Sequence, residues 1–410
     1  MRSAVKGRSV HAIGWCIVLD ALGATQALAQ CSPQWLAQHP GTALNGDAFA
    51  FTVFGGQLIA GGGFTTAGGQ TMNRVARWTG DSWAPLGAGF NNYVWALTVH
   101  DGALYAGGLF QSSGAQFVGR VARWDGAGWK PVGTGFSSAV FSCVSTTTGL
   151  YVGTAGSGQT TPARVHRWDG SNWTTLGGGM TFPGGPPPIV YALAEFEGDL
   201  IAGGQFAYTG GQFTSLIARW NGTSCQAMGS GIGGIDPWVS ELVVFQNELI
   251  AAGTSGIMRW NGTDWAPLGG VEYQHVYAMT IYRGDLIAGG WVPFTSGTSL
   301  TGVARWNGST WSPLGFGTGP VVEALAACGD QLFCGGGIDT AGGLPVSFWA
   351  RYGCQCQADC DSSGSLSIAD FGCFQTQYVL AHPYADCNAS GTLTVADFGC
   401  FQGKYVLGCP

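Results

Sequence analysis

The sequence predicts an all-β protein made of repeated units, and three observations support this fold class. Glycine supplies 71 of the 410 residues and only 10% of residues are charged, a composition typical of sheets joined by tight turns. Aromatic residues are abundant, which argues against disorder. An Arg-aromatic pair recurs about every 45 residues, and such a period in an all-β chain indicates a β-propeller. The pairs are Arg77-Trp78, Arg123-Trp124, Arg167-Trp168, Arg219-Trp220, Arg259-Trp260 and Arg305-Trp306, with Arg351-Tyr352 as a degenerate seventh.

The N-terminus has the features of an export signal. Arg2, Lys6 and Arg8 form a cationic segment, an apolar run follows over residues 12–28, and cleavage is expected after Ala29. A membrane anchor is the alternative, but the apolar run is short and interrupted. We therefore expect a secreted or cell-surface protein with no membrane span in the mature chain.

We expect three segments: a signal peptide over residues 1–29, a propeller over residues 30–353 and a small module over residues 354–410. The boundary after residue 353 is marked by an abrupt change in composition. The formal net charge is −7, and the absence of a basic excess argues against nucleic acid as a partner.

Each unit contains four strand-like segments, so seven units predict seven four-stranded blades. The first two segments form a hairpin, as in VWALTVHDGALYAGG over residues 94–108, whose turn is Asp101-Gly102. Most units place residues there that tolerate the positive φ of a tight hairpin turn, whereas the third unit has STTTG. The third strand carries the Arg-Trp pair, and the fourth begins five residues after that tryptophan.

Two tryptophans stand five residues apart in most units. This spacing places the indoles across a four-residue hairpin loop, where they pack as a cross-strand pair. Because a feature of every blade serves the packing that blades share, we interpret these Trp and Arg residues as structural and expect ligand sites where blades differ. The pairs are Trp78 and Trp83, Trp124 and Trp129, Trp168 and Trp173, Trp260 and Trp265, and Trp306 and Trp311, with Cys225 replacing the second tryptophan of the fourth unit.

The last unit ends at Gly353 without a fourth strand. The segment CSPQWLAQHPG over residues 31–41 looks like the missing strand, with Trp35 in the place of Trp83. The sequence therefore predicts that the N-terminal strand closes the ring.

The cysteines suggest a disulfide at this closure. Loss of the signal peptide removes Cys16 and leaves an even number, which suits an oxidising compartment. Cys31 falls beside Cys354 and Cys356, and we predict a bond to one of these two. The remaining cysteine would pair within the tail, for example with Cys409.

A Gly-Gly doublet follows the second strand and precedes an aromatic strand and a downstream tryptophan. This arrangement resembles a kelch-type blade, and the resemblance covers residues 30–353. The chain differs from kelch units in having Val-Ala-Arg-Trp where they have an acidic-Tyr segment, and it lacks the Gly-His signature of the WD repeat. The resemblance implies a propeller and names no function. The doublets include Gly107-Gly108, Gly203-Gly204 and Gly289-Gly290.

The tail contains two copies of one unit, which start at Ala358 and Ala385. Each matches a calcium loop followed by a helix, in which alternate residues of a tight loop supply oxygen ligands. An Asp/Ser-rich turn without metal is the alternative. The predicted ligands of two Ca²⁺ sites are Asp359, Asp361, Ser363, Ser365, Ser367 and Asp370, and Asp386, Asn388, Ser390, Thr392, Thr394 and Asp397. The second loop has fewer carboxylates, so weaker binding is expected there.

Aspartate at loop position 12, one helix after each loop and the duplication resemble dockerin modules. The resemblance implies a docking tag that binds a cohesin-like domain or a cell-surface component. Dockerins often have hydroxyl residues at loop positions 10 and 11, where this chain has Ile368-Ala369 and Val395-Ala396, so the partner does not carry over. Cysteines at loop position 2 and on the helices suggest stiffening disulfides: Cys360, Cys387, Cys373 and Cys400.

Three functions remain open. The first is a secreted or cell-surface calcium-binding interaction protein, with the propeller as a ligand- or protein-binding platform and the tail as a docking tag. The second is a carbohydrate-binding component of an extracellular polysaccharide-degrading assembly. The third is a hydrolase or oxidase, which would need two acids or a His-Tyr cluster at one channel mouth. The sequence assigns no catalytic residue and no cofactor besides Ca²⁺.

Aromatic residues stand near the start of most of the predicted innermost strands. Packing between blades explains most of them, and a sugar-stacking rim at the channel mouth is the alternative, with Glu323 as the odd member. These aromatic residues are Phe49, Trp95, Phe141, Tyr191, Trp238 and Tyr277. Asn221, Asn261 and Asn307 match glycosylation sequons, but an Asn-Gly hairpin turn explains them as well.

Overall fold

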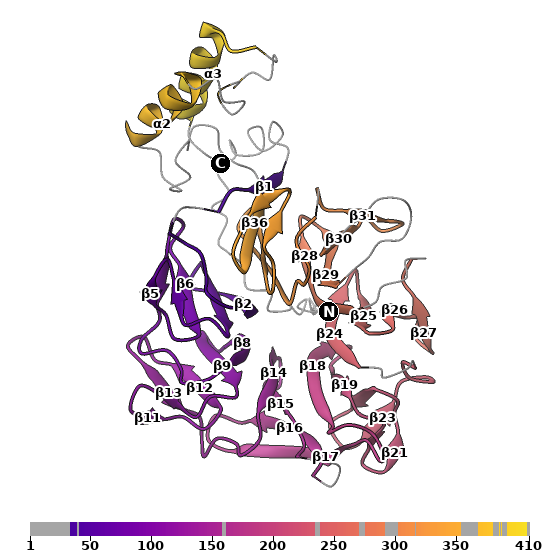
Figure 1. The fold of residues 1–410 in the computed structure, drawn as a ribbon. Helices are drawn as coiled ribbons and strands as arrows, with labels where there is room; N and C mark the ends of the chain where they lie inside the picture. Colours follow the sequence, from indigo (N-terminus) through magenta and orange to yellow (C-terminus); the bar gives the residue numbers. More distant parts are fainter. Residues whose placement is uncertain are drawn as a thin grey trace, which may run out of the picture.

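The protein is a seven-bladed β-propeller followed by two short helices, as its computed structural model shows (Figure 1). Seven antiparallel sheets stand around a central axis, each with four blade strands, so the predicted fold class is confirmed. The structure describes residues 33–38, 41–157, 161–233, 238–269, 275–291, 302–315, 317–353, 368–379, 385, 387 and 392–407.

The blade strands follow the chain from the innermost to the outermost position. Blades 1 to 3 comprise β2 (Ala48–Phe54), β3 (Gln57–Gly62), β6 (Val75–Trp78) and β7 (Trp83–Pro85); β8 (Val94–His100), β9 (Ala103–Gly108), β12 (Val121–Trp124) and β13 (Trp129–Pro131); and β14 (Val140–Thr146), β15 (Gly149–Thr154), β16 (Ala163–Trp168) and β17 (Trp173–Thr181). Blades 4 to 6 comprise β18 (Ile189–Phe196), β19 (Asp199–Gln205), β22 (Ile217–Trp220) and β23 (Cys225–Ala227); β24 (Val239–Phe245), β25 (Glu248–Gly253), β26 (Gly256–Trp260) and β27 (Trp265–Pro267); and β28 (His275–Tyr282), β29 (Asp285–Trp291), β30 (Val303–Trp306) and β31 (Trp311–Pro313). Blade 7 comprises β32 (Ala324–Cys328), β33 (Gln331–Gly335), β36 (Trp349–Gly353) and β1 (Gln34–Leu36).

Small hairpins join the second and third strands of several blades. They are β4 (Thr66–Ala67) with β5 (Gln70–Thr71), β10 (Ser112–Ser113) with β11 (Gln116–Phe117), β20 (Tyr208–Thr209) with β21 (Gln212–Phe213), and β34 (Thr340–Ala341) with β35 (Leu344–Pro345). The hairpin of blade 4 pairs with the end of β17, so it links the sheets of blades 3 and 4.

The N-terminal strand closes the ring, as predicted. β1 pairs with β36 in antiparallel register, with Trp35 opposite Tyr352, and the innermost strands β2 and β32 are in contact. The Trp35 indole N–H also donates to the carbonyl of Leu314 in blade 6, at 2.9 Å. Cys31, Cys354 and Cys356 lie outside the described residues, and their disulfide remains a prediction.

The hairpin turns show why small or polar residues occupy them. Asp101 and Gly102 both have positive φ, 48° and 70°, which is the geometry that matches the twist of the flanking strands. The third blade differs, since its first two strands are joined through Thr147 and Thr148 to Gly149, whose φ is 145°.

The Gly-Gly doublets let neighbouring blades approach closely. A Cβ on Gly107 would lie 2.5 Å from Cγ1 of Val140 in the next blade, and one on Gly108 would lie 2.1 Å from the carbonyl oxygen of Tyr93. Neither position has space for a side chain. Gly61, Gly153, Gly203 and Gly289 accept the valine of the next blade in the same way.

The tryptophan pairs pack across strands, as predicted from their spacing. Trp124 stands opposite Trp129, and their ring centroids are 5.4 Å apart in an edge-on arrangement. The Trp129 N–H donates to the carbonyl of Leu86 in the preceding blade at 3.0 Å, and Trp173 and Trp311 make the equivalent bonds. The repeated indoles therefore hold adjacent blades together.

The tail contains the helices α2 (Ile368–Val379) and α3 (Val395–Leu407). They share a small core in which the rings of Phe374 and Phe401 stack at 4.1 Å. Cys387 and Cys400 form a disulfide with their Cα atoms 5.8 Å apart, and Cys373 is also disulfide-bonded. The predicted stiffening of the module by disulfides is confirmed for these cysteines.

None of the helices in the described segments combines the length and apolar character needed to cross a membrane. The proposed signal peptide lies outside the described residues. The even number of cysteines in the mature chain suits pairing in disulfides. In the propeller, however, Cys143, Cys225 and Cys334 are free thiols.

Candidate functional site

A β-bulge recurs near the start of the innermost strands and determines the direction of one side chain in each of these blades. The register shifts between Ala48 and Ala50 in blade 1 and between Val94 and Ala96 in blade 2, which leaves Phe49 and Trp95 unpaired. A bulge redirects the extra residue away from the ladder. The bulged residues of blades 1 to 6 are Phe49, Trp95, Phe141, Tyr191, Ser240 and Tyr277.

Blade 7 places Glu323 at the equivalent position. Glu323 lies directly before β32, and its N–H donates to the carbonyl of Gly335 at 2.8 Å. All seven side chains are partly exposed. We call these residues the channel-mouth ring, because they lie where the innermost strands begin around the central axis: Phe49, Trp95, Phe141, Tyr191, Ser240, Tyr277 and Glu323.

Aromatic contacts join the channel-mouth ring from blade to blade. Trp95 and Phe141 stack almost in parallel, with centroids 4.2 Å apart, and Phe141 meets Tyr191 edge-on at 5.5 Å. Tyr93 bridges Phe49 and Trp95, at 5.9 and 6.1 Å. The rings thus form an aromatic arc over blades 1 to 4, in which neighbouring blades contact each other as expected for packing between blades.

Acidic groups complete the ring where blade 7 meets blade 1. Burial and, to a smaller extent, the neighbouring charge of Asp47 raise the pKa of Glu323 to about 7. Burial also raises the pKa of Asp47. Tyr277 has a raised pKa through burial and through the charge of Glu323. Glu323 therefore lies within electrostatic reach of a second acid and of a phenol.

Blade 5 differs from the prediction. Trp238 precedes Val239 and is not the bulged residue, which is Ser240. The reason is that the bulge follows a valine in blades 2 to 6, and in blade 5 that valine is followed by serine. The Trp238 ring instead stacks on His275 of blade 6, with centroids 5.5 Å apart.

Sequence reasoning missed two residues beside the ring. Asp47 stands directly before Ala48, and His275 directly before Val276, at the same repeat position as Trp238 and Tyr93. His275 lies between the rings of Trp238 and Trp291. The sequence held a signal, because aligning the units on the small apolar residue at or near the start of each innermost strand brings these residues into one column.

The other histidines and the sequons have structural explanations. His166 accepts or donates a hydrogen bond with Thr175 at 3.0 Å, and burial lowers its pKa to about 4. Asn261 accepts hydrogen bonds from the backbone of Thr263 and Asp264 in a tight turn. Asn221 and Asn307 do the same, so the Asn-Gly turns are confirmed.

The predicted calcium ligands fall mostly outside the described residues. Asp370 lies on α2, while Thr392, Thr394 and Asp397 are described before and on α3. The Thr394 N–H donates to Oδ2 of Asp397 at 2.7 Å, and Asp397 is buried. This bond, from the residue before the helix to an acid three residues later, is one of the two bonds of a capping box. Among the described residues, no group of three or more His, Cys, Asp or Glu side chains is placed to hold a metal ion.

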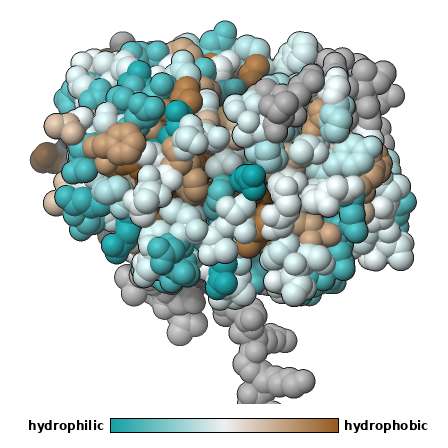
Figure 2. Space-filling model, turned by 90° about the horizontal axis from the view of Figure 1, so that it is seen from below, coloured by the Kyte–Doolittle hydropathy of each residue, from teal (hydrophilic) through white to brown (hydrophobic). Residues whose placement is uncertain are grey.

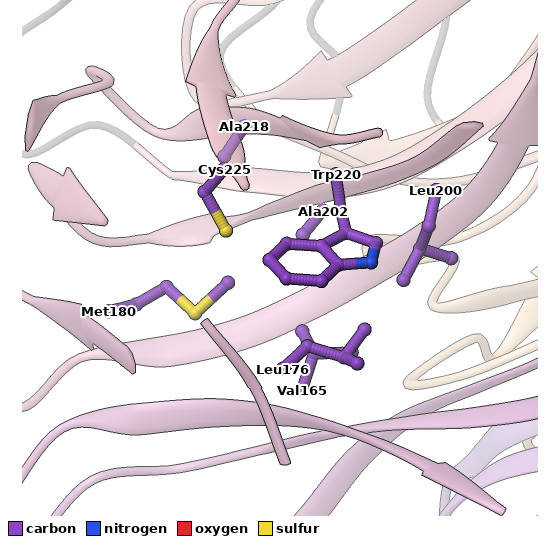
Figure 3. A pocket seen from close by; sticks show the side chains of 8 residues that line it. All are labelled: Val165, Leu176, Met180, Leu200, Ala202, Ala218, Trp220 and Cys225. Carbon is purple, nitrogen blue, oxygen red and sulfur yellow. The ribbon is translucent and has the colours of Figure 1, made fainter. Parts of the chain in front are cut away.

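A small apolar cavity lies between blades 3 and 4 (Figure 3). Its volume is about 10 Å³, and Leu176, Met180, Trp220 and Cys225 are among its lining residues. That space holds about one water molecule. Cys225 replaces the second tryptophan of a pair here, so the cavity marks a missing indole and not a ligand site.

On the side of the molecule seen in Figure 2, apolar residues form small groups between hydrophilic ones. Individual apolar side chains on a surface are normal and need no functional explanation. The large exposed ones include Tyr93, Phe117, Tyr208, Phe213 and Trp291.

Comparisons with known proteins support the fold and not a family. No protein-family model matches the sequence, and no curated protein matches it either. The crystal structure of the WD40 β-propeller domain of Doa1 is similar, with a TM-score of 0.51, 15% identity and coverage of 79% of this chain and 97% of that chain. A computationally designed protein, Ika8, matches with a TM-score of 0.46 and 14% identity over 78% of this chain and all of its own. At these identities the likeness to Doa1 shows that the chain shares the propeller fold.

Proposed function

We propose that this chain is an exported binding protein whose propeller binds its ligand at the channel-mouth ring. The propeller fold fits a binding platform, but the fold alone does not choose a site. The ring is supported by one observation. Its side chains occupy the same repeat position in every blade, but the residue type differs from blade to blade. The position recurs along the innermost strands, yet its residue changes from the bulged Phe49 and Ser240 to Glu323, which directly precedes β32.

A saccharide is the ligand class that this chemistry favours. The partly exposed rings of Trp95, Phe141 and Tyr191 offer flat apolar faces, which suit the apolar faces of pyranose rings. The carboxyl groups of Glu323 and Asp47 offer hydrogen-bond partners for hydroxyl groups. Most ligand sites combine apolar and aromatic walls with a few polar groups in this way.

Isothermal titration with neutral hexasaccharides tests the proposal. Wild-type protein should bind at least one of cellohexaose, xylohexaose and mannohexaose, and Phe141→Ala should weaken that binding about tenfold or more. The matched control is Phe117→Ala, because Phe117 is 60% exposed on a small hairpin outside the ring. Equal binding by Phe141→Ala and wild type, or no binding to any of the sugars, would contradict the proposal.

Hydrolysis of a saccharide is a second candidate, and the acid pair favours it. An acid whose pKa lies near neutrality can donate a proton to a leaving group while a second carboxylate acts beside it. Glu323 and Asp47 meet the first requirement of such a pair, since they interact and both have raised pKa values. Tyr277 adds a phenol next to Glu323.

The release of reducing ends distinguishes catalysis from binding. If the ring hydrolyses a bound sugar, Glu323→Gln should abolish release and keep affinity. Glu241→Gln is the control, because Glu241 is another acid whose pKa burial raises to about 7, on β24 of blade 5. Binding by the wild type without release would leave the ring as a binding site alone.

The tail is proposed as a calcium-dependent docking tag. Its predicted ligands are carboxylate, amide and hydroxyl oxygens, which suit Ca²⁺ as a hard cation. Thr394 and Asp397, two of the described members of the second loop, already place their oxygens together at the start of α3. When bound, Ca²⁺ would neutralise the loop carboxylates. The partner expected from the dockerin resemblance is a cohesin-like domain or a cell-surface component.

A further inference from the structure

The arginine of the repeated Arg-Trp pair is neutralised in blades 4, 5 and 6. Arg219 pairs with Asp199 at 2.5 Å, Arg259 with Glu248 at 3.5 Å and Arg305 with Asp285 at 2.6 Å. Each acid occupies the first position of the second blade strand, directly after the hairpin turn. In these three blades the counter-charge therefore has one fixed place, whereas blades 1 and 7 have Gln57 and Gln331 there.

Blades 2 and 3 lack an acid at that place. Ala103 starts β9 and Gly149 starts β15, so Arg123 and Arg167 have no carboxylate at the place where blades 4, 5 and 6 supply one. Arg167 donates to the carbonyl of Thr148 instead, from Nε at 2.9 Å and from Nη2 at 2.5 Å, and its Nη1 is left for a ligand. Within the part of the chain that the structure describes, neither arginine forms an ion pair, and both are exposed.

These two arginines line one groove between blades 2 and 3. Its volume is about 600 Å³, and His100, Tyr105 and Trp168 also line it. This volume is within the range of small-ligand sites. The groove lies at the end of β8 and the channel-mouth ring at its start, about 17–20 Å away along an extended strand. The groove is thus a second site on the opposite side of the propeller.

The imidazole of His100 is held in place at the groove. Nδ1 is 2.9 Å from the hydroxyl of Ser145, and Nε2 is 3.5 Å from the carboxylate of Asp101. The second acid of the lining, Asp169, accepts hydrogen bonds from the backbone N–H groups of Ser171 and Asn172. The backbone of the turn therefore occupies the carboxylate of Asp169, whereas the side chains of Arg123 and Arg167 remain exposed.

We propose that this groove binds a carboxylate-bearing saccharide, with Arg123 and Arg167 holding the carboxylate. A guanidinium group binds a carboxylate through paired hydrogen bonds. The hydroxyl groups of Tyr105 and Thr148 both donate and accept, which suits sugar hydroxyls. The partly exposed Trp168 indole supplies an apolar face beside them.

Titration of the full chain with trigalacturonate tests this assignment, with neutral galactotriose as the paired probe. Wild type should bind trigalacturonate, and Arg123→Gln should weaken binding about tenfold or more. Ala103→Asp should weaken it similarly, because it restores the missing counter-charge while Arg123 stays in place. Arg259→Gln is the matched control and should bind like wild type, since Arg259 is the same repeat position in blade 5.

Three results would overturn the assignment. These are equal affinity for the acidic and the neutral trisaccharide, unchanged binding in both Arg123→Gln and Ala103→Asp, or stronger Arg123-dependent binding of a triglutamate peptide than of trigalacturonate. Phe141→Ala keeps the two sites apart. It should weaken neutral hexasaccharide binding at the channel-mouth ring without changing trigalacturonate affinity, so each site can fail alone.

Discussion

The indole of Trp35 and the phenol ring of Tyr352 pack edge-on with centroids 5.3 Å apart, which joins the first strand of the propeller to its last blade. Trp35 also donates to Leu314 O in blade 6. One side chain therefore connects the N-terminal strand to two blades, and the closure of the ring depends on it.

Replacing Trp35 should destabilise the whole propeller. Trp35→Ala removes a buried indole, and we expect the free energy of unfolding to fall by about 3–5 kcal/mol. Trp35→Phe keeps a ring against Tyr352 but loses the N–H donor, so a smaller loss of about 1 kcal/mol or somewhat more is expected. Urea denaturation measures both. An alanine variant as stable as wild type would show that β1 does not close the ring.

Replacing Cys225 with tryptophan should stabilise the interface of blades 3 and 4. The Cys225 Sγ lies 3.0 Å from the position of a Cβ on Gly177, where other blades place an indole. A tryptophan there would fill the cavity and could donate to the carbonyl of Leu176, as Trp129 does to Leu86. We expect a gain of about 0.5–2 kcal/mol.

Thermal denaturation of Cys225→Trp checks this expectation, with Cys225→Ala as the control. The alanine variant should be no more stable than wild type, because it enlarges the cavity. A lower melting temperature for Cys225→Trp than for Cys225→Ala would show that β23 cannot accept an indole.

Glu323 should make stability fall as pH rises through neutrality. Its pKa increases from 4.5 to about 7 in the folded chain, so between these values the folded state holds a proton that the unfolded state has lost. The resulting stability is fully present below pH 4.5 and is lost as pH rises through about 7. Glu323→Gln should therefore gain stability relative to wild type between pH 5 and pH 8.

Urea denaturation at pH 5 and pH 8 measures this difference. Glu248→Gln is a surface control, since Glu248 is 44% exposed beside Arg259. If Glu323→Gln and wild type differ by the same amount at both pH values, Glu323 does not titrate in this range.

A substitution at Asp397 can distinguish its predicted role in calcium binding from its role in capping α3. Asp397→Asn keeps an oxygen that accepts the Thr394 N–H, so α3 should remain, but it loses the charge that Ca²⁺ requires. Calorimetric titration of the full chain with Ca²⁺ should show two sites in wild type and a second site weakened about tenfold or more in the variant. Asp359→Ala should weaken the first site. No calcium uptake by wild type would refute the dockerin-like interpretation.

The repeat made most of the fold predictable from sequence, whereas the sites depend on differences between repeats. The spacing of Trp124 and Trp129 predicted the blade hairpin, and the match of Trp35 to Trp83 predicted the closure. The bulge was not visible, so Trp238 was placed in the ring where Ser240 stands. The groove was missed because it arises from two absences, at Ala103 and Gly149, on strands of different blades.

The measurement that tests the central claim most directly compares two tryptophans of blade 2. Trp95 belongs to the channel-mouth ring and Trp124 to the repeated pair that packs between blades. Melting temperature and affinity for the tightest-binding neutral hexasaccharide should be measured for Trp95→Ala and Trp124→Ala. We predict that Trp95→Ala loses affinity and melts close to wild type, and that Trp124→Ala melts lower and binds normally when folded. The reverse result, with binding lost through Trp124 and retained without Trp95, would contradict the assignment of the ring as the ligand site.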